Sequence, residues 1–189
     1  IKICLFNKNL NLIKKIRIKT NLLNNYYLSK NLKFIKNFNS EIEKVLICSV
    51  VPLAYKKIKK FIEKSIKVEC NELKQLKLNN FLKIRVNKKQ IGSDRLANAI
   101  STIDKKRNYI VIDFGTATNF DVVIKDNYIG GIIAPGVNLS LSTLSDKASL
   151  IPKIKLEKIK SVIGKNTISA IRSGFYHGYS GLIDNIIQM

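Results

Sequence analysis

A short stretch in the second half of the chain, residues 110–123, combines a carboxylate with small and hydroxylated residues and reads IVIDFGTATNFDVV. Its Gly-Thr-Ala-Thr segment would expose backbone N–H groups that no large side chain shields, and its hydroxyls can bond phosphate oxygens. Asp113 would end the first strand beside that segment, where a carboxylate can hold a cation near phosphate. An ordinary hairpin with a capping aspartate explains the same residues, because short glycine motifs have many false matches. The stretch alone leaves both interpretations open.

A second stretch, QIGSDRLANAI at residues 90–100, places a glycine before an acid and a base. Gly92 allows close approach of another group, and Asp94 and Arg95 fall at the expected start of a helix. The helix dipole favours an ionised carboxylate there by about 0.3–1 kcal/mol. Such an aspartate can orient a hydroxyl nucleophile while the arginine holds an anionic substrate group. An N-cap followed by a surface arginine is the alternative.

The other reactive residue types suggest no second site. The Asp-Phe-Gly triplet at residues 113–115 lacks the companion motifs of protein kinases. His177 is the only histidine and has no partner motif, so a structural role is expected. Cys4, Cys48 and Cys70 form no Cys-x-x-Cys pair. We expect them to be buried in strands and reduced, as in a cytoplasmic protein.

The overall composition favours a globular protein with a strongly basic surface. Of the 189 residues, 46% are apolar, and the formal net charge is +21. Such a charge can indicate nucleic-acid binding. However, the basic residues are nearly all lysines spread through every segment, whereas arginine is the better reader of phosphates and guanine edges. A solvated surface is therefore favoured over a nucleic-acid partner. No run approaches the ~18 apolar residues of a membrane helix, so no membrane association is expected.

The first half of the chain alternates strands and helices, as in an α/β protein. Residues 1–6 and 10–20 are expected to form a strand hairpin. The next helix has an apolar face of four residues: Leu28, Leu32, Ile35 and Phe38. Residues 44–51 are typical of a buried parallel strand, and Pro52 starts a helix. That helix turns four apolar residues inward: Ile58, Phe61, Ile62 and Ile66. Further strands are expected at residues 66–70 and 82–86.

The second half restarts the same order after a polar break at residues 105–108. A helix before the break carries Leu96, Ile100 and Ile103 on one face. The strands expected after it are residues 109–113, 119–124 and 128–133. One helix follows Pro135-Gly136, and a long one begins near Asn166. Two halves that each begin with hairpin strands suggest a duplicated α/β unit.

The final helix carries small residues on one face: Ala170, Gly174, Gly178 and Gly181. Each glycine inside a helix costs about 1 kcal/mol relative to alanine. We therefore expect this face to pack closely against another backbone.

Five motifs occur together in the order and spacing seen in type III pantothenate kinases, and the chain resembles that family. The motifs are IGSDRLANAI, VIDFGTATNFDVV, GGIIAPGVNLSLSTL, ASLIPKIKL and IGKNTISAIRSGFYHGYSGLID. The match is close over residues 91–189 and extends to residues 1–90 in element order only. The resemblance implies an α/β fold of two ribonuclease H-like lobes, residues 1–104 and 105–189, of the actin-like ATPase (acetate and sugar kinase) superfamily. It also implies ATP-dependent phosphorylation of pantothenate to 4'-phosphopantothenate, the first step of coenzyme A biosynthesis.

The resemblance assigns a role to residues of both stretches. Asp94 would be the catalytic base that accepts the proton of the pantothenate hydroxyl. The residues that would contact pantothenate with it are Gly92, Ser93, Arg95 and Thr167. Gly115 and Thr116 would contact ATP, which binds with Mg²⁺, and Asp113 would bind a monovalent cation, K⁺ or NH₄⁺. Positioning and charge neutralisation supply most of the catalysis in phosphoryl transfer, which suits such a set of groups.

The resemblance further implies a cytoplasmic homodimer, in which the helix near PGVNLSLSTL completes the pantothenate pocket of the second subunit. The apolar surface of that helix is expected from Leu139, Leu141 and Leu144. The family's first-strand Asp-x-Gly-Asn-Thr phosphate loop and its last glycine-rich nucleotide contact have no counterpart here. The resemblance therefore implies a chain that is incomplete at both ends.

One position departs from the family pattern inside the matched region. The family's aromatic residue that packs on pantothenate aligns with Arg85. Arg85 either pairs with the pantothenate carboxylate or lies in solvent, with Phe81 or another nearby aromatic residue filling the pocket. The main rival function is a regulatory homologue, a transcription accessory factor without kinase activity. The weaker rival is another actin-like sugar or acetate kinase. The intact motif residues favour the enzyme.

Overall fold

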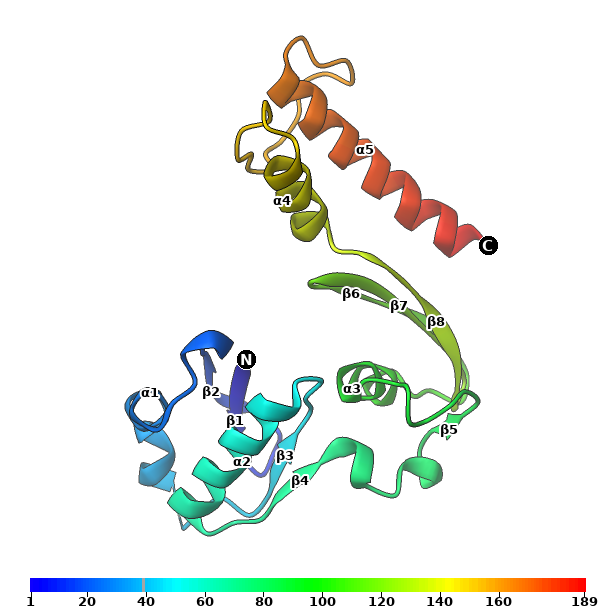
Figure 1. The fold of residues 1–189 in the computed structure, drawn as a ribbon. Helices are drawn as coiled ribbons and strands as arrows, with labels where there is room; N and C mark the ends of the chain where they lie inside the picture. Colours follow the sequence, from blue (N-terminus) through cyan, green and yellow to red (C-terminus); the bar gives the residue numbers. More distant parts are fainter. Residues whose placement is uncertain (39) are drawn as a thin grey trace. The chain divides into compact units, whose positions relative to one another are not determined.

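The computed structural model describes residues 1–38 and 40–189, which fold as two compact units (Figure 1). Unit 1 consists of residues 1–78 and 89–97, and unit 2 consists of residues 79–88 and 98–189. Helices and strands occur in both units, so the expected mixed α/β class is confirmed. None of the helices in the described residues is both long and apolar enough to span a membrane.

Unit 1 contains two sheets of two strands each. β1 (Lys2–Phe6) and β2 (Leu12–Arg17) form the expected antiparallel hairpin. Its turn is stabilised by the Asn7 side chain, which accepts hydrogen bonds from the backbone N–H groups of Asn9 and Asn11 at 3.0 and 2.9 Å. β3 (Val45–Ile47) and β4 (Cys70–Glu72) pair in parallel, as expected for the first of them.

The strand expected at residues 44–51 is shorter and less buried than its apolar run predicts. Only Val45–Ile47 form β3. Val45 and Ile47 pack against the core, whereas Leu46 is 55% exposed. Successive strand residues point to opposite faces, so a strand with one covered face buries only alternate residues. The prediction of full burial was wrong for this reason.

The helices of unit 1 enclose its core. α1 (Asn25–Asn31) is capped by Asn24, whose side chain accepts from the Tyr27 N–H at 2.7 Å. The expected single helix then tightens into a 3₁₀ turn at Lys33–Phe38. The Asn31 amide donates to the Tyr27 carbonyl at 2.8 Å, a bond that competes with helix continuation. The buried apolar side chains of the core include Ile18, Leu28, Leu32, Ile58, Ile62 and Ile66.

α2 (Pro52–Ile66) begins at Pro52 as expected, because proline is preorganised for the first helical position. It ends at Lys67, which has a left-handed backbone with φ of 56°. Three of the residues expected on its inner face, Ile58, Ile62 and Ile66, are buried. Further 3₁₀ turns lie at Thr20–Leu22, Leu73–Gln75 and Leu78–Asn80.

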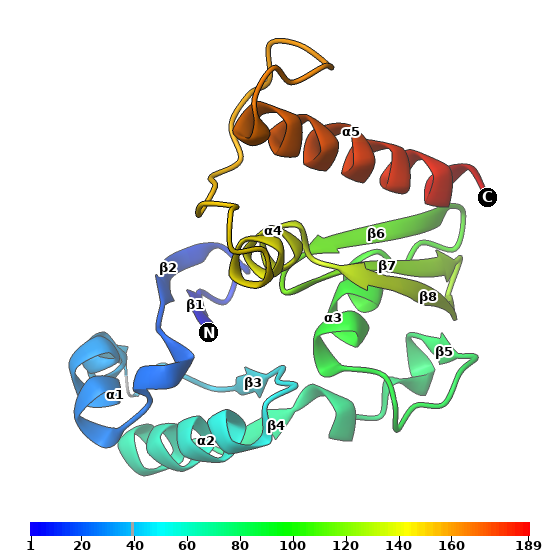
Figure 2. The same ribbon diagram turned by 45° about the horizontal axis from the view of Figure 1, so that its top comes forward.

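Unit 2 is built on a four-stranded sheet with the order β5-β8-β7-β6. Its strands are β5 (Lys83–Ile84), β6 (Asn108–Phe114), β7 (Ala117–Ile124) and β8 (Asn127–Pro135). β6, β7 and β8 form an antiparallel meander and β5 joins β8 in parallel, an arrangement visible in Figure 2. The three long strands confirm the predicted ones and extend them. α4 (Val137–Lys147) continues from β8, and α5 (Thr167–Gln188) closes the unit.

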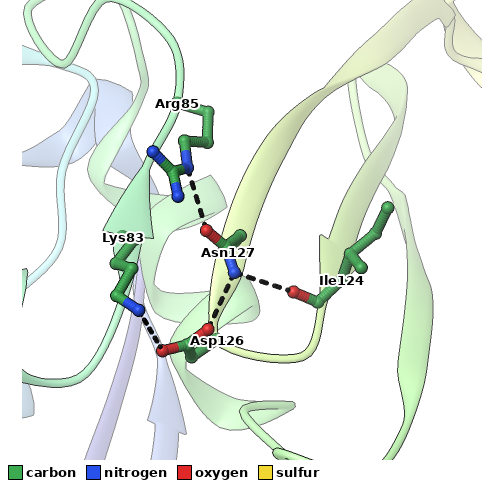
Figure 3. A network of polar contacts seen from close by, with 5 residues as sticks. All are labelled: Lys83, Arg85, Ile124, Asp126 and Asn127. Carbon is green, nitrogen blue, oxygen red and sulfur yellow. Dashed lines mark hydrogen bonds and ion pairs between the residues drawn. The ribbon is translucent and has the colours of Figure 1, made fainter.

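β5 is fastened to the turn between β7 and β8 by side chains as well as by backbone (Figure 3). The Lys83 ammonium pairs with the Asp126 carboxylate at 3.1 Å, and the Arg85 Nε donates to the Asn127 side-chain oxygen at 2.9 Å. The hydrogen bond and charge of Lys83 hold the pKa of Asp126 below its ordinary value. Arg85 therefore has a partner inside unit 2. Phe81, the alternative pocket residue, is 64% exposed.

The three glycines on the small-residue face of α5 do not pack closely against another backbone segment of this chain, so that expectation is wrong for them. A methyl group added at Gly174, Gly178 or Gly181 would meet nothing within 4 Å. The close approach occurs at Gly164, where a Cβ would lie 2.2 Å from the Ala170 backbone nitrogen. The glycine that packs on the helix thus lies in the loop before it.

Two of the three cysteines are not buried as expected. Cys70 is 1% exposed, whereas Cys4 and Cys48 are exposed. In β1 the inward positions belong to Ile3 and Leu5, so the alternation of the strand turns Cys4 outward. Cys48 follows the last residue of β3, beyond the paired strand.

Candidate functional site

The Gly-Ser-Asp-Arg motif forms the start of α3 (Ser93–Ser101) in unit 1. Asp94 lies in the first turn, and its Oδ1 accepts a hydrogen bond from the Arg95 backbone N–H at 2.8 Å. This places the carboxylate at the positive end of the helix dipole, as predicted. Asp94 and Arg95 are both half-buried, so the carboxylate is held in place and still accessible.

Gly92 is required by the position of the Asp94 carboxylate. A Cβ at residue 92 would lie 2.3 Å from Asp94 Oδ1 and 2.9 Å from the Val50 side chain. The carboxylate therefore folds back over the glycine, in the space that any other residue would fill. The close approach predicted for Gly92 is confirmed, and its partner is the acid of the same motif.

Ser93 is anchored by a residue that the motif does not contain. It is 2% exposed, and its hydroxyl donates a hydrogen bond to a carboxylate oxygen of Glu72, at the end of β4. Close by, the Lys74 ammonium donates to the backbone carbonyl of Lys89 at 2.9 Å. The sequence did not predict a role for Glu72 or Lys74, because nothing in the local pattern connects residues 72–74 with residues 89–93.

A cavity of about 420 Å³ lies against this motif, entirely within unit 1. Its lining consists of Ser49, Val50, Pro52, Tyr55, Glu72, Lys74, Gln90, Ile91, Gly92 and Ser93. The volume is in the range of small-molecule sites, and the lining combines apolar walls with a few polar groups, as such sites do.

The pKa of the Cys48 thiol is raised by partial burial and by negative charge beside this cavity. Although the residue is exposed overall, partial burial of its thiol raises the pKa. The negative charges of Glu72 and Asp94 raise the pKa further. Both carboxylates therefore act on the same small region of unit 1.

The predicted phosphate-binding stretch is a tight hairpin between β6 and β7 in unit 2. Asp113 is half-buried near the end of β6, and Gly115 and Thr116 form the exposed connection. In the hairpin register Asp113 stands opposite Asn119. Residues directly opposite in an antiparallel pair point to the same face, so these two oxygen-bearing side chains are neighbours.

The start of α4 lies directly against this hairpin. Gly136, which precedes the helix, donates its N–H to the Thr116 carbonyl at 3.0 Å. A Cβ on Gly136 would lie 2.3 Å from the Gly115 carbonyl oxygen and 2.5 Å from that of Thr116. A tight turn and the start of a helix thus meet at one place, where the N–H groups of Gly115 and Gly136 are bonded to the Ala117 and Thr116 carbonyls.

Thr167 is the first residue of α5 and is exposed. The preceding Asn166 forms a capping box with Ser169, with hydrogen bonds of 2.9 and 3.1 Å. The helix start predicted near Asn166 is confirmed. Gly92, Ser93, Asp94 and Arg95 thus lie together in unit 1, while Asp113, Gly115 and Thr116 lie together in unit 2, which also contains Thr167.

His177 is exposed on α5 and contacts the Tyr176 ring edge-on, with the ring centroids 5.3 Å apart. It lines a second cavity, of about 480 Å³, together with small and apolar residues of α5 and the preceding loop. The structural role expected for it stays a prediction.

The family model that matches this chain and its similar relatives carry the same name. The family model described as type III pantothenate kinase matches residues 1–189. A type III pantothenate kinase of Pelagibacter ubique (strain HTCC1062) is 56% identical over 188 residues, covering 100% of this chain and 76% of that protein. One from Sulfurihydrogenibium sp. (strain YO3AOP1) is 37% identical over 195 residues, covering 96% of this chain and 75% of that protein. The chain belongs to the type III pantothenate kinase family.

A crystal structure of a proposed Baf family transcriptional activator from Campylobacter jejuni also resembles the chain. It is 22% identical, covers 80% of this chain and 68% of its own, and superposes with a TM-score of 0.48. A likeness of this degree carries no functional argument.

Proposed function

We propose that this chain phosphorylates pantothenate with ATP, giving 4'-phosphopantothenate and ADP as the first step of coenzyme A biosynthesis. Its membership of the type III pantothenate kinase family supports this reaction. The relatives that match the chain are themselves named type III pantothenate kinases. The observation that carries the proposal is the Asp94 carboxylate, held over Gly92 at the first turn of α3 beside a small-molecule cavity.

Asp94 is the base that accepts the proton of the pantothenate hydroxyl as the oxygen attacks the γ-phosphate. A general base must lie within hydrogen-bond reach of the proton that it removes. The bond from the Arg95 N–H occupies one oxygen of the carboxylate and orients the other. Gly92, Ser93, Arg95 and Thr167 contact pantothenate. Gly92 and Ser93 line the cavity.

ATP is bound by Gly115 and Thr116, whose exposed hairpin meets the N-terminus of α4. Asp113 binds the monovalent cation, K⁺ or NH₄⁺, and Mg²⁺ accompanies the nucleotide. The neighbouring side chains of Asp113 and Asn119 fit this assignment, because hard cations prefer oxygen ligands. A cation bound there offsets phosphate charge as the phosphoryl group moves.

The wider architecture belongs to the same proposal. We assign residues 1–104 and 105–189 to two ribonuclease H-like lobes of the actin-like ATPase superfamily. Residues 79–88 and 98–104, which this division gives to the first lobe, belong to unit 2. It acts in the cytoplasm as a homodimer in which α4 completes the partner's pantothenate pocket. Leu139 supports this use of α4, because it is 46% exposed. Leu141 was expected on the same surface, but it is 4% exposed and packs inside unit 2.

The experiment is a coupled assay of ADP release from ATP and Mg²⁺, with pantothenate present or omitted, in potassium or in sodium buffer. We expect ADP release that requires pantothenate and that is faster in potassium. Mass spectrometry should find a product heavier than pantothenate by one phosphoryl group. Pantothenate-independent ATP hydrolysis would contradict the assigned substrate, and equal rates in both buffers would remove the cation from Asp113.

A further inference from the structure

We infer that Glu72 and Lys74 form a clamp that positions the Gly-Ser-Asp-Arg loop for pantothenate, with Glu72 acting through Ser93. This inference rests on the proposed function, since it assigns a positioning role at the same site. Both residues come from one short segment, the end of β4 and the first residues of the following 3₁₀ turn. They reach the loop at residues 89–93 from a segment that lies outside the motif.

The clamp holds the loop at both of its ends. At the near end, the Lys74 ammonium donates to the Lys89 carbonyl at 2.9 Å. At the far end, Glu72 accepts from the Ser93 hydroxyl, across a separation of 21 residues in sequence. Between these two bonds lie the residues that line the cavity, Gln90, Ile91 and Gly92. A loop tied at both ends loses conformational freedom before the substrate arrives, which lowers the entropic cost of binding.

The Glu72 bond is well placed to carry this effect. Ser93 is 2% exposed, so loss of its acceptor would leave a hydroxyl buried without its bond. Hydrogen bonds to a charged acceptor are about twice as strong as neutral ones. Ser93 is also the first residue of α3 and directly precedes Asp94. Movement of Ser93 therefore moves the carboxylate that is assigned to the chemistry.

The test compares Glu72 variants by steady-state kinetics on the full chain. We expect Glu72→Ala to raise KM for pantothenate about tenfold, the low end for a hydrogen bond to a charged group, with a much smaller change in kcat. Glu72→Gln keeps an oxygen that accepts from Ser93, so it should restore most of the affinity. Equal damage from Glu72→Gln and Glu72→Ala would overturn the inference.

Glu63 provides the matched control within unit 1. It is also a carboxylate that accepts a hydrogen bond from another segment, the Cys70 backbone N–H at 2.9 Å, but it does not contact the loop. Glu63→Ala should lower the free energy of unfolding and leave KM for pantothenate unchanged. If Glu63→Ala raised KM as much as Glu72→Ala, the effect would be general loosening of the unit and the clamp would be refuted.

A double mutant separates positioning from direct contact with substrate. If Glu72 acts through Ser93, the variant Glu72→Ala/Ser93→Ala should be no worse than the worse single variant, because residues that share one interaction are not additive. Additive losses would mean that Glu72 acts on pantothenate by itself, which would also overturn the inference.

Hydrogen exchange tests whether Glu72 holds the loop, without relying on enzyme activity. Amides of residues 92–96 should exchange about tenfold faster in Glu72→Ala than in the parent, with no change in Glu63→Ala. If the parent does not phosphorylate pantothenate, the proposed function fails. The exchange measurement still shows in that case whether Glu72 holds the loop, and unchanged exchange in Glu72→Ala would refute the clamp.

Discussion

The Asp94 carboxylate illustrates how single residues in this chain depend on their immediate neighbours. It occupies the space above Gly92 and accepts a bond from the Arg95 N–H, so its nearest contacts lie within the motif.

Asp94→Asn should reduce kcat by about 10²–10⁴, the usual contribution of a general base. The asparagine oxygen can still accept from the Arg95 N–H, so the fold of the loop should survive. The measurement is the initial rate of pantothenate phosphorylation, with Asp184→Asn on the exposed side of α5 as the control. Near-normal turnover of Asp94→Asn would exclude the residue as the base.

Cys70 should resist alkylation in the native protein. Burial, followed by the negative charge of Glu63, raises the pKa of its thiol from 9.0 to about 11. At pH 8 only about a thousandth of it is then thiolate, the reactive form. Mass spectrometry after iodoacetamide treatment should find Cys4 labelled first, and Cys70 labelled only in urea. Rapid labelling of native Cys70 would contradict its burial.

The raised pKa of the Cys70 thiol also predicts how the free energy of unfolding changes at alkaline pH. Because the pKa is raised on folding, the folded state binds this proton more tightly than the unfolded state. The contribution of the neutral thiol is complete below pH 9, the ordinary value, and is lost as the pH rises towards 11. Cys70→Ala should remove this component from the pH dependence of the unfolding free energy.

At the scale of elements, the junction between the β6–β7 hairpin and α4 depends on a close backbone approach. Gly136→Ala would place a methyl group against two backbone carbonyls, which cannot rotate away. We expect a loss of about 1–3 kcal/mol in the free energy of unfolding, as for other overpacked sites. Urea denaturation measures this loss.

The control for this variant lies on α5. At Gly174 an added Cβ meets nothing within 4 Å, and alanine is the better helix former. Gly174→Ala should therefore stabilise the protein by up to about 1 kcal/mol. A stable Gly136→Ala variant would show that the hairpin and α4 do not meet as described.

The attachment of β5 can be tested through Arg85. Its Nε bond to Asn127 gives it a structural partner, so Arg85→Ala should cost about 1 kcal/mol of stability and leave KM for pantothenate unchanged. Asn127→Ala should cost more, because its amide nitrogen also donates to the Ile124 carbonyl and the Asp126 carboxylate. The double variant should be little less stable than Asn127→Ala. A several-fold rise in KM for Arg85→Ala would instead favour pairing with the pantothenate carboxylate.

At the scale of the whole molecule, the proposed homodimer predicts a mass in solution of about twice the 21.4 kDa of the chain. Light scattering after size exclusion provides the mass. Leu139→Asp on the exposed side of α4 should shift the protein towards monomer and raise KM for pantothenate, because the pocket would lose its second subunit. Leu150 is 92% exposed and outside the helix, so Leu150→Asp is the control. A monomeric parent protein at assay concentrations would contradict the proposal.

Features that depend on residues close together in the chain could be predicted from the sequence. The hairpins, the proline start of α2, the cap at Asn166 and the placement of Asp94 in a first helical turn all follow from local periodicity and backbone preferences. The five ordered motifs likewise predicted the family, because such motifs are carried by the sequence alone.

Contacts between distant segments could not be predicted from the sequence. The bond from Ser93 to Glu72, the burial of Leu141 and the packing of Gly164 rather than the α5 glycines depend on how elements pack. A helical periodicity shows that a face is small or apolar, but it does not show what covers that face. Likewise, a carboxylate at the end of a short strand carries no local sign of the loop that it holds, because that contact exists only once both segments have folded against each other.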